Sequence, residues 1–388
     1  MAPAKWLAVG AVTAAAAVAR QAGAPGSPGT AIAGYTFVTD VSQHARLDLD
    51  IQAIEEAETD YATALTVYTE GANSAKDDGS KRTLQGFSTS YLEAGPDQAE
   101  PLANISQAFW GDWDYADRHL LAALTGNDSD TYGQYGSGEL AADDASRTQI
   151  IKKVIKFSLV PQYVQHELEE ALAEHSSAEY AAAVKHWDEA WAFYAGSLEA
   201  GNATGYSAYI LPEKRAKNFG TVDGNRSAVN VRFLAAMTSG QALVSAAADD
   251  PTPLLDTVRC IRGLMAVAPI QGCLRYAYRV SDPAVSPAEE LAKESAEAWA
   301  FCAAALPGLA AVDATAAETV REQVYLAGTK RIDWPVVRAA FGPANLNSMG
   351  LSCADIGTLN TEHPEAAHPV CEDSAGGLTN AGQGTNFC

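Results

Sequence analysis

The sequence predicts an all-α protein, built as a bundle of repeated helical hairpins with an irregular, disulfide-tied C-terminal tail. Three observations indicate this fold class. Alanine is abundant and strand-type alternation is scarce, apolar residues recur three and four positions apart, and several helical stretches resemble one another. With 388 residues, 47% of them hydrophobic, the chain is long enough for one large domain or two ordinary ones.

The N-terminus is typical of a secretory signal peptide, expected over residues 1–23. Lys5 supplies a positive charge, residues 6–19 form an apolar run, and small residues follow. The apolar run is too short to span a bilayer comfortably, which favours a cleaved signal over an anchor. The Pro-, Gly- and Ser-rich stretch behind it predicts a linker over residues 24–39.

Residues 40–341 are expected to form the helical repeat domain. Helix-type periodicity is present over residues 40–71, 82–95, 104–125, 143–174, 178–200, 226–248, 254–280, 287–306, 314–326 and 334–341. Pro161 is expected to kink or break its helix, and Pro269 to interrupt another. Residues 201–225 are rich in turn formers and are expected to be a loop.

An internal repeat connects these helices. The stretch from Ile150 resembles the stretch from Thr257, and the following aromatic helices match, with Trp191 on Trp299. Copies are expected near residues 40–95, 150–220 and 257–328, the first of them the weakest. The recurring aromatic residues predict packing between the hairpins.

Six cysteines, an even number, all lie in the last third of the chain: Cys260, Cys273, Cys302, Cys353, Cys371 and Cys388. An even number in an exported chain is typical of a disulfide framework. Three fall in helical sequence and three in the tail, residues 342–388. If all six pair, at least one bond must join the tail to the helices. No C-x-x-C spacing of a zinc site is present.

The formal charge is −22, from 26 basic and 48 acidic residues. Such a surface repels nucleic acid and anionic membranes and concentrates cations, although it also serves solubility alone. Four N-x-S/T sequons predict glycosylation sites and agree with export, at Asn104, Asn127, Asn202 and Asn225.

Two neighbouring predicted helices each carry a histidine and a glutamate on one side. His166 and Glu170 are four residues apart, and His186 and Glu189 are three apart. Two imidazoles and two carboxylates from a pair of helices suit iron, zinc or manganese better than calcium. The competing interpretation is a solvated helix face, because charged side chains are mostly exposed.

The repeat extends this candidate set. Asp60, His186 and Glu294 fall at equivalent positions of the three copies, and Glu297 is equivalent to Glu189. If the copies surround an axis, these side chains converge on it. The run HELEE lacks the second histidine of a zinc peptidase helix, so that class is disfavoured.

The helix HWDEAWAFYAG, the preceding HELEEAL hairpin and their repetition resemble the iron-assimilating, high-CO2-inducible periplasmic proteins of green algae. The resemblance covers residues 40–341. It implies a secreted, non-enzymatic protein that helps to capture iron, with acidic and histidine side chains as ligands. These positions are Glu170, His186, Glu189, Glu294 and Glu297. Thr63 stands where the first copy would carry the counterpart of Glu189.

We therefore predict a secreted or periplasmic protein that binds iron through a His/Glu site in a helical bundle. Tyr163 and Tyr194 are further candidate ligands for ferric iron. A membrane iron transporter or the cell wall are the partners expected besides the metal ion. Two other classes stay open: a secreted helical interaction or cell-wall protein without metal, and a metal-dependent hydrolase or oxidase.

Overall fold

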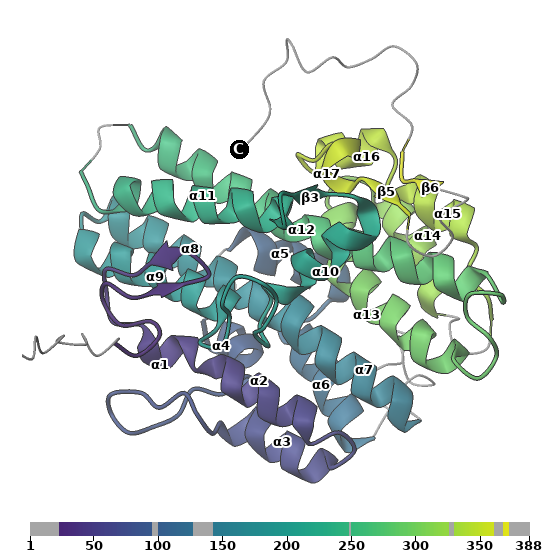
Figure 1. The fold of residues 1–388 in the computed structure, drawn as a ribbon, viewed down its shortest axis with the longest axis horizontal. Helices are drawn as coiled ribbons and strands as arrows, with labels where there is room; N and C mark the ends of the chain where they lie inside the picture. The colour runs from purple at the N-terminus through teal and green to yellow at the C-terminus, as the bar shows by residue number, and fades with distance from the viewer. Residues whose placement is uncertain are drawn as a thin grey trace, which may run out of the picture.

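The computed structural model describes residues 23–94, 100–126, 143–247, 250–325, 330–360 and 368–371. It confirms the predicted all-α class, with helices packed side by side and only short two-residue strands (Figure 1). The signal peptide expected over residues 1–23 lies almost entirely outside the described residues.

The described part of the N-terminal half contains nine α-helices, of which α8 and α9 are the longest. They are α1 (Ser42–Ala45), α2 (Leu47–Glu56), α3 (Tyr61–Glu70), α4 (Gly86–Ala94), α5 (Pro101–Trp110), α6 (Tyr115–Thr125), α7 (Asp144–Val154), α8 (Val160–Ser176) and α9 (Tyr180–Ala195). The C-terminal half continues with α10 (Ile210–Phe219), α11 (Ala228–Val244), α12 (Thr252–Ser281), α13 (Leu291–Ala310), α14 (Ala314–Tyr325), α15 (Trp334–Ala340), α16 (Pro343–Ser348) and α17 (Cys353–Ile356).

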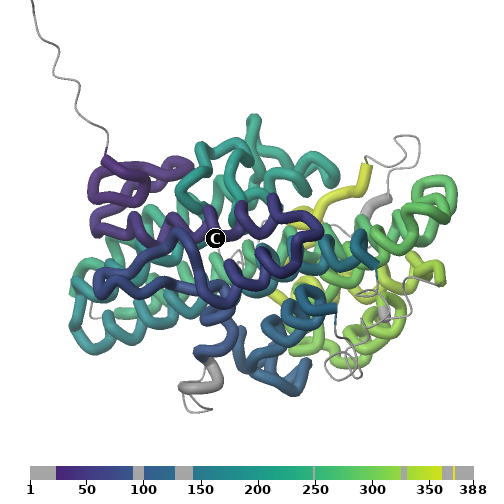
Figure 2. Tube along the Cα trace, turned by 90° about the horizontal axis from the view of Figure 1, so that it is seen from below, coloured from purple at the N-terminus to yellow at the C-terminus, as the bar shows by residue number. Residues whose placement is uncertain are grey.

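The described residues also contain three short antiparallel strand pairs. They are β1 (Ala31–Ile32) with β2 (Tyr35–Thr36), β3 (Val222–Asp223) with β4 (Arg226–Ser227), and β5 (Thr358–Leu359) with β6 (His368–Pro369). The N-terminal segment lies along α8 and α9, and the last helices lie towards the other end of the long axis (Figure 2).

Two long helical hairpins dominate the packing. Helix α8 pairs with α9, and α12 pairs with α13. Trp191 of α9 and Trp299 of α13, matched in the sequence, are both buried, which agrees with a packing role for the aromatic helices. Helix α7 packs on α13, and α11 packs on both α9 and α12, so the two hairpins share one core. The internal repeat itself stays a prediction.

Proline interrupts neither long helix. Helix α12 runs through Pro269 without a break, whereas the sequence predicted an interruption. Pro161 lies in the first turn of α8, directly after a π-helical turn (Ile155–Leu159) that joins α7 to α8. A proline is tolerated in a first turn because its missing N–H has less to bond there.

The stretch 201–225, expected to be a loop, contains α10. Ile210, Leu211 and Phe219 of this helix are buried, and Gly220 ends it in the left-handed conformation. The flanking turn formers concealed a helix that tertiary burial stabilises.

The stretch 24–39, expected to be a linker, also packs against the core. Its strands β1 and β2 form a hairpin in which Ile32 and Tyr35 are buried. Asp188 of α9 holds the end of this segment: it accepts hydrogen bonds from the Tyr35 hydroxyl at 2.7 Å and from the backbone N–H groups of Val38 and Thr39 at 3.0 and 2.8 Å. A buried carboxylate with several donors is well satisfied, which fixes the segment in place.

Disulfide bonds join Cys273 to Cys302, between α12 and α13, and Cys353 to Cys371 in the tail. Cys260 is also disulfide-bonded. Cys388 lies outside the described residues. Among the helices of the described ranges, none has the length and apolar character needed to cross a membrane.

The close contact of α11 with α9 makes Gly240 sensitive to substitution. An alanine Cβ at Gly240 would lie 2.0 Å from Cζ2 of the fully buried Trp187. Gly240→Ala is therefore expected to destabilise the protein by about 3 kcal/mol, as overpacked cores do. Urea unfolding measures this loss. In the control Gly263→Ala on α12, the new Cβ meets only Leu351 at 3.9 Å, so stability should be unchanged or slightly raised.

Candidate metal centre

The α8–α9 hairpin brings two glutamates and a histidine together. Glu167 lies on α8, and His186 and Glu189 lie one turn apart on α9. The Nδ1 atom of His186 is 2.7 Å from Oε2 of Glu167 and 3.5 Å from Oε2 of Glu189. One ligand atom from each residue lies within 4.8 Å of the others, so a single cation could contact all three.

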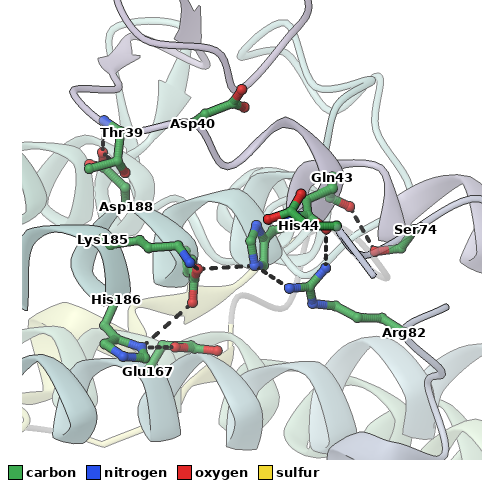
Figure 3. A network of polar contacts seen from close by, with 12 residues as sticks. Thr39, Asp40, Gln43, His44, Ser74, Arg82, Glu167, Lys185, His186 and Asp188 are labelled. Carbon is green, nitrogen blue, oxygen red and sulfur yellow. Dashed lines mark hydrogen bonds and ion pairs between the residues drawn. The ribbon is translucent and has the colours of Figure 1, made fainter. Parts of the chain in front are cut away.

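A second histidine approaches this group from the N-terminal segment. Nε2 of His44, on α1, lies 3.0 Å from Oε1 of Glu189, and the His44 side chain is fully buried. The hydroxyl of Ser74 donates to the backbone oxygen of Gln43 at 2.7 Å, which holds α1 in place (Figure 3). The group therefore combines residues of the α8–α9 hairpin with a residue of α1, which lies far away in the sequence.

The pKa values of the two buried glutamates shift in opposite directions. Burial raises the pKa of Glu167 to about 7, against the hydrogen bond from His186. Burial acts to raise the pKa of Glu189 too, but the hydrogen bond from His44 and the positive charges nearby outweigh it and lower that pKa. Two carboxyl groups in one buried place cannot both ionise cheaply unless a cation lies between them.

The pKa values of His186 and His44 also shift in opposite directions. The hydrogen bond to Glu167 raises the pKa of His186, with a smaller opposing effect of burial. Burial lowers the pKa of His44 despite its contact with Glu189. A neutral imidazole carries the electron pair that a metal ion needs, so the lowered pKa of His44 favours the form that can bind a metal ion and the raised pKa of His186 favours the form that cannot.

Two basic side chains border the centre. The Arg82 guanidinium contacts Nε2 of His44 and donates to Oε1 of Gln43 at 3.0 Å (Figure 3). Nζ of Lys185 lies 3.5 Å from Oε1 of Glu189, and its side chain is exposed. These cations balance part of the carboxylate charge, so a bound metal ion would compete with them for Glu189 and His44.

Further acidic groups continue along α8 towards solvent. Glu170 and Glu174 form a half-buried candidate set with His186, and Glu100, before α5, forms another with His166 and Glu170. His166 contacts Glu100 directly. Burial acts to lower the pKa of His166, but the contact with Glu100 outweighs burial and raises it. A row of carboxylates thus runs from the surface to the buried group.

Aromatic side chains lie next to these histidines and carboxylates. Tyr163 of α8 stacks on Phe87 with ring centroids 3.7 Å apart and lies 4.9 Å from the His166 ring. Burial and then the charge of Glu167 raise the pKa of Tyr163, so its hydroxyl stays protonated without a metal ion. Tyr194 lies elsewhere and donates to Oδ1 of Asn230.

Four of the seven metal ligands predicted from the sequence lie in these candidate groups, and three do not. His186 and Glu189 belong to the buried group, and His166 and Glu170 lie in the adjoining half-buried sets. The other three are in none of the candidate groups of the described residues: Asp60 caps α3 through Thr63, Glu294 pairs with Arg279, and Glu297 pairs with Lys153. Asp60, His186 and Glu294 therefore share no candidate metal group among the described residues.

Sequence reasoning missed three members of these sets, Glu100, Glu167 and Glu174, and also the adjacent His44. Glu167 is the neighbour of His166 in the sequence, but it was not chosen as a ligand. His44 and Glu100 lie in segments that the local sequence does not pair with α8 or α9. The buried donor set is thus Glu167, His186 and Glu189, with His44 adjacent. Mixed imidazole and carboxylate ligands are typical of iron, zinc and manganese sites.

Comparison with known proteins adds an independent observation. The Fea1 family, described as low iron-inducible periplasmic protein, matches residues 6–380 of the sequence. No curated protein and no solved structure matches the chain significantly. The family match extends over nearly the whole sequence, including the hairpin that carries the buried Glu/His group and the N-terminal segment that adds His44. The chain therefore belongs to the Fea1 family of low iron-inducible periplasmic proteins.

Proposed function

We propose that this periplasmic protein binds an iron ion between α8 and α9 and holds it for uptake by a membrane iron transporter. Glu167, His186 and Glu189 are the proposed ligands, with His44 as a fourth. The observation that supports this most strongly is the meeting of two buried carboxylates at one imidazole nitrogen, with distances of 2.7 and 3.5 Å. Without a cation, this arrangement concentrates negative charge in a buried place.

The choice of iron rests on two arguments. A donor set of imidazole and carboxylate accepts iron in either oxidation state but is too rich in nitrogen for calcium or magnesium. Family membership adds that proteins of this kind are induced when iron is scarce. A protein made under iron limitation, with a ligand set suited to iron, is best explained as an iron carrier or store.

The outer carboxylates give the proposed centre an entry route. Glu170 and Glu174 are half-buried and lie near His186, between solvent and the buried group. An incoming hydrated ion would meet these side chains first and exchange water for protein oxygen in steps. The strongly acidic surface, with its charge of −22, raises the local cation concentration in the same way.

Metal analysis of the purified protein tests this proposal. Wild-type protein is expected to take up stoichiometric iron from ferrous iron under anaerobic conditions or from ferric citrate. The double variant His186→Ala, Glu189→Ala removes two of the proposed ligands and should retain none after desalting. Iron content unchanged in this variant would contradict the site, and no saturable iron uptake by the wild type would favour an interaction protein instead.

The hairpin offers a matched control. His175 and Glu179 lie at the other end of the same hairpin and belong to none of the candidate metal groups of the described residues. The double variant His175→Ala, Glu179→Ala removes the same two residue types, so it should keep its iron. Circular dichroism of both variants separates lost ligands from lost structure.

A further inference from the structure

A buried guanidinium with unused donors lies in the other half of the molecule, away from the candidate metal centre. Arg215 of α10 is only 8% exposed, and its Nε and Nη1 atoms have no hydrogen-bond partner among the described residues. A buried cation with unused N–H groups is costly, because folding removes its water without replacing it. Such a group is expected to have a partner that binds from outside the chain.

Other basic groups surround the same place. The Cζ atom of Arg215 lies 5.9 Å from the ring centroids of both Tyr276 and Phe301. Arg275 of α12 lies over the Tyr276 ring at 5.0 Å, and Nζ of Lys153 lies 5.9 Å from the Phe301 ring. Three cations from α7, α10 and α12 thus gather around two aromatic rings.

One carboxylate lies close to these cations. Glu297 of α13 acts on Arg215 through its charge, and it already pairs with Lys153 at 3.1 Å. Burial and then the charge of Arg275 lower the pKa of Arg215 to about 10. Glu297 therefore leaves Nε and Nη1 of Arg215 without a hydrogen bond among the described residues.

The residues of this cluster differ in their exposure. Arg275 and Tyr276 are half-buried, and the neighbouring Lys214 is exposed, whereas Arg215 lies at the inner end. A small ligand could therefore pass the half-buried residues and reach the free nitrogens of Arg215. The rings of Tyr276 and Phe301 form an apolar floor that excludes water from the contact.

We propose that Arg215, Arg275 and Lys153 form a binding site for a small oxyanion, such as phosphate, carbonate or a carboxylate. The oxygens of such an ion accept hydrogen bonds from guanidinium and ammonium groups at the same time, which a single chloride ion cannot do as well. The bound ion accepts hydrogen bonds from Nε and Nη1 of Arg215.

Isothermal titration of the full-length secreted chain with inorganic phosphate, in the presence of a metal chelator, tests this site. The chelator prevents phosphate from binding through iron. Wild-type protein is expected to bind phosphate saturably at millimolar concentration or below, and Arg215→Gln should weaken this binding at least about 10-fold. Titrations with carbonate and acetate then identify the preferred oxyanion.

Matched variants separate the possible outcomes. Arg259→Gln replaces an exposed arginine of α12 that pairs with Asp256, so it should leave phosphate binding unchanged. The variant His186→Ala, Glu189→Ala should also bind phosphate normally, since its residues lie on another helix pair. If Arg215→Gln does not fold, the half-buried Arg275→Gln replaces it and should weaken binding similarly. Absence of saturable binding for all three anions, or unchanged binding in the variant used, overturns the proposal.

Discussion

Replacing Glu167 with glutamine is expected to weaken iron binding at least about 100-fold, because even groups outside the ligand shell cost 10- to 100-fold when removed. Glu167 is 4% exposed and is the one carboxylate that α8 contributes to the buried group. Glutamine keeps the size of the side chain but lacks the charge. Competition with a coloured chelator measures the change in affinity.

The neighbouring Glu169→Gln is the control for this substitution. Glu169 also lies on α8, but it pairs with Arg262 of α12 and belongs to none of the candidate metal groups of the described residues. Its iron affinity should equal that of the wild type. Equal affinities for Glu167→Gln and wild-type protein would remove Glu167 from the ligand set.

The same substitution should change how stability depends on pH in the metal-free protein. Burial raises the folded pKa of Glu167 from 4.5 to about 7, so the folded state binds more protons than the unfolded chain between these values. Stability contributed by this group is present below pH 4.5 and is lost as the pH rises to 7, by at most about 1.4 kcal/mol per pH unit. Urea unfolding at several pH values should show this slope in the wild type and a smaller one in Glu167→Gln.

Asp188→Ala is expected to cost about 4 kcal/mol of stability, because it leaves the buried Tyr35 hydroxyl and several part-buried donors without their acceptor. The Asp188 carboxylate accepts hydrogen bonds from the backbone and hydroxyl of Thr39, from Val38, from Tyr35 and from Nε2 of Gln241, and it is fully buried. Urea unfolding measures the loss. Iron affinity should fall too, since the released segment leads directly into α1 and His44.

Two further variants provide comparisons for the stability of Asp188→Ala. Asp188→Asn retains one acceptor oxygen and should lose less stability than the alanine variant. Asp78→Ala removes an exposed aspartate that accepts from Ser80, so its stability should change by less than about 0.5 kcal/mol. An Asp188→Ala protein as stable as the wild type would show that the N-terminal segment is held by its apolar residues alone.

Most helices could be predicted from the sequence because their periodicity and their turns are local signals. Trp187 and Trp191 recur at helical spacing, and both are fully buried in α9 as a packing stripe should be. Helix α10 escaped prediction because it is short and lies between glycines. The hairpin β1–β2 escaped because the acceptor that fixes it, Asp188, lies about 150 residues further along the chain.

Half of the candidate site could be predicted for the same reason. His186 and Glu189 lie one turn apart on a single helix, so the local sequence is enough to place them together. Glu167 had a usable signal that was overlooked. Glu167 and Glu189 both stand eleven residues from Ala178, which lies midway between α8 and α9. In an antiparallel hairpin, residues equally far from the turn lie opposite each other.

His44 and Glu100 carried no such signal. His44 lies on the four-residue helix α1, within a stretch that was expected to be helical, but it reaches Glu189 only because the N-terminal segment folds back over α9. Glu100 precedes α5 and meets His166 through tertiary packing. The expectation that Asp60, His186 and Glu294 converge assumed a common axis, whereas Glu294 pairs with Arg279 within the other hairpin.

The contact between Tyr35 and Asp188 spans 153 residues and has a consequence for the order of folding. The beginning of the chain is synthesised first, yet Asp188 cannot hold it until α9 has been made. His44 can therefore join Glu189 only in a chain whose first half is already assembled, since distant contacts must wait for loop closure. A chain translocated only as far as α8 would lack His186 and Glu189, so the proposed iron site can form only after α9 has been exported.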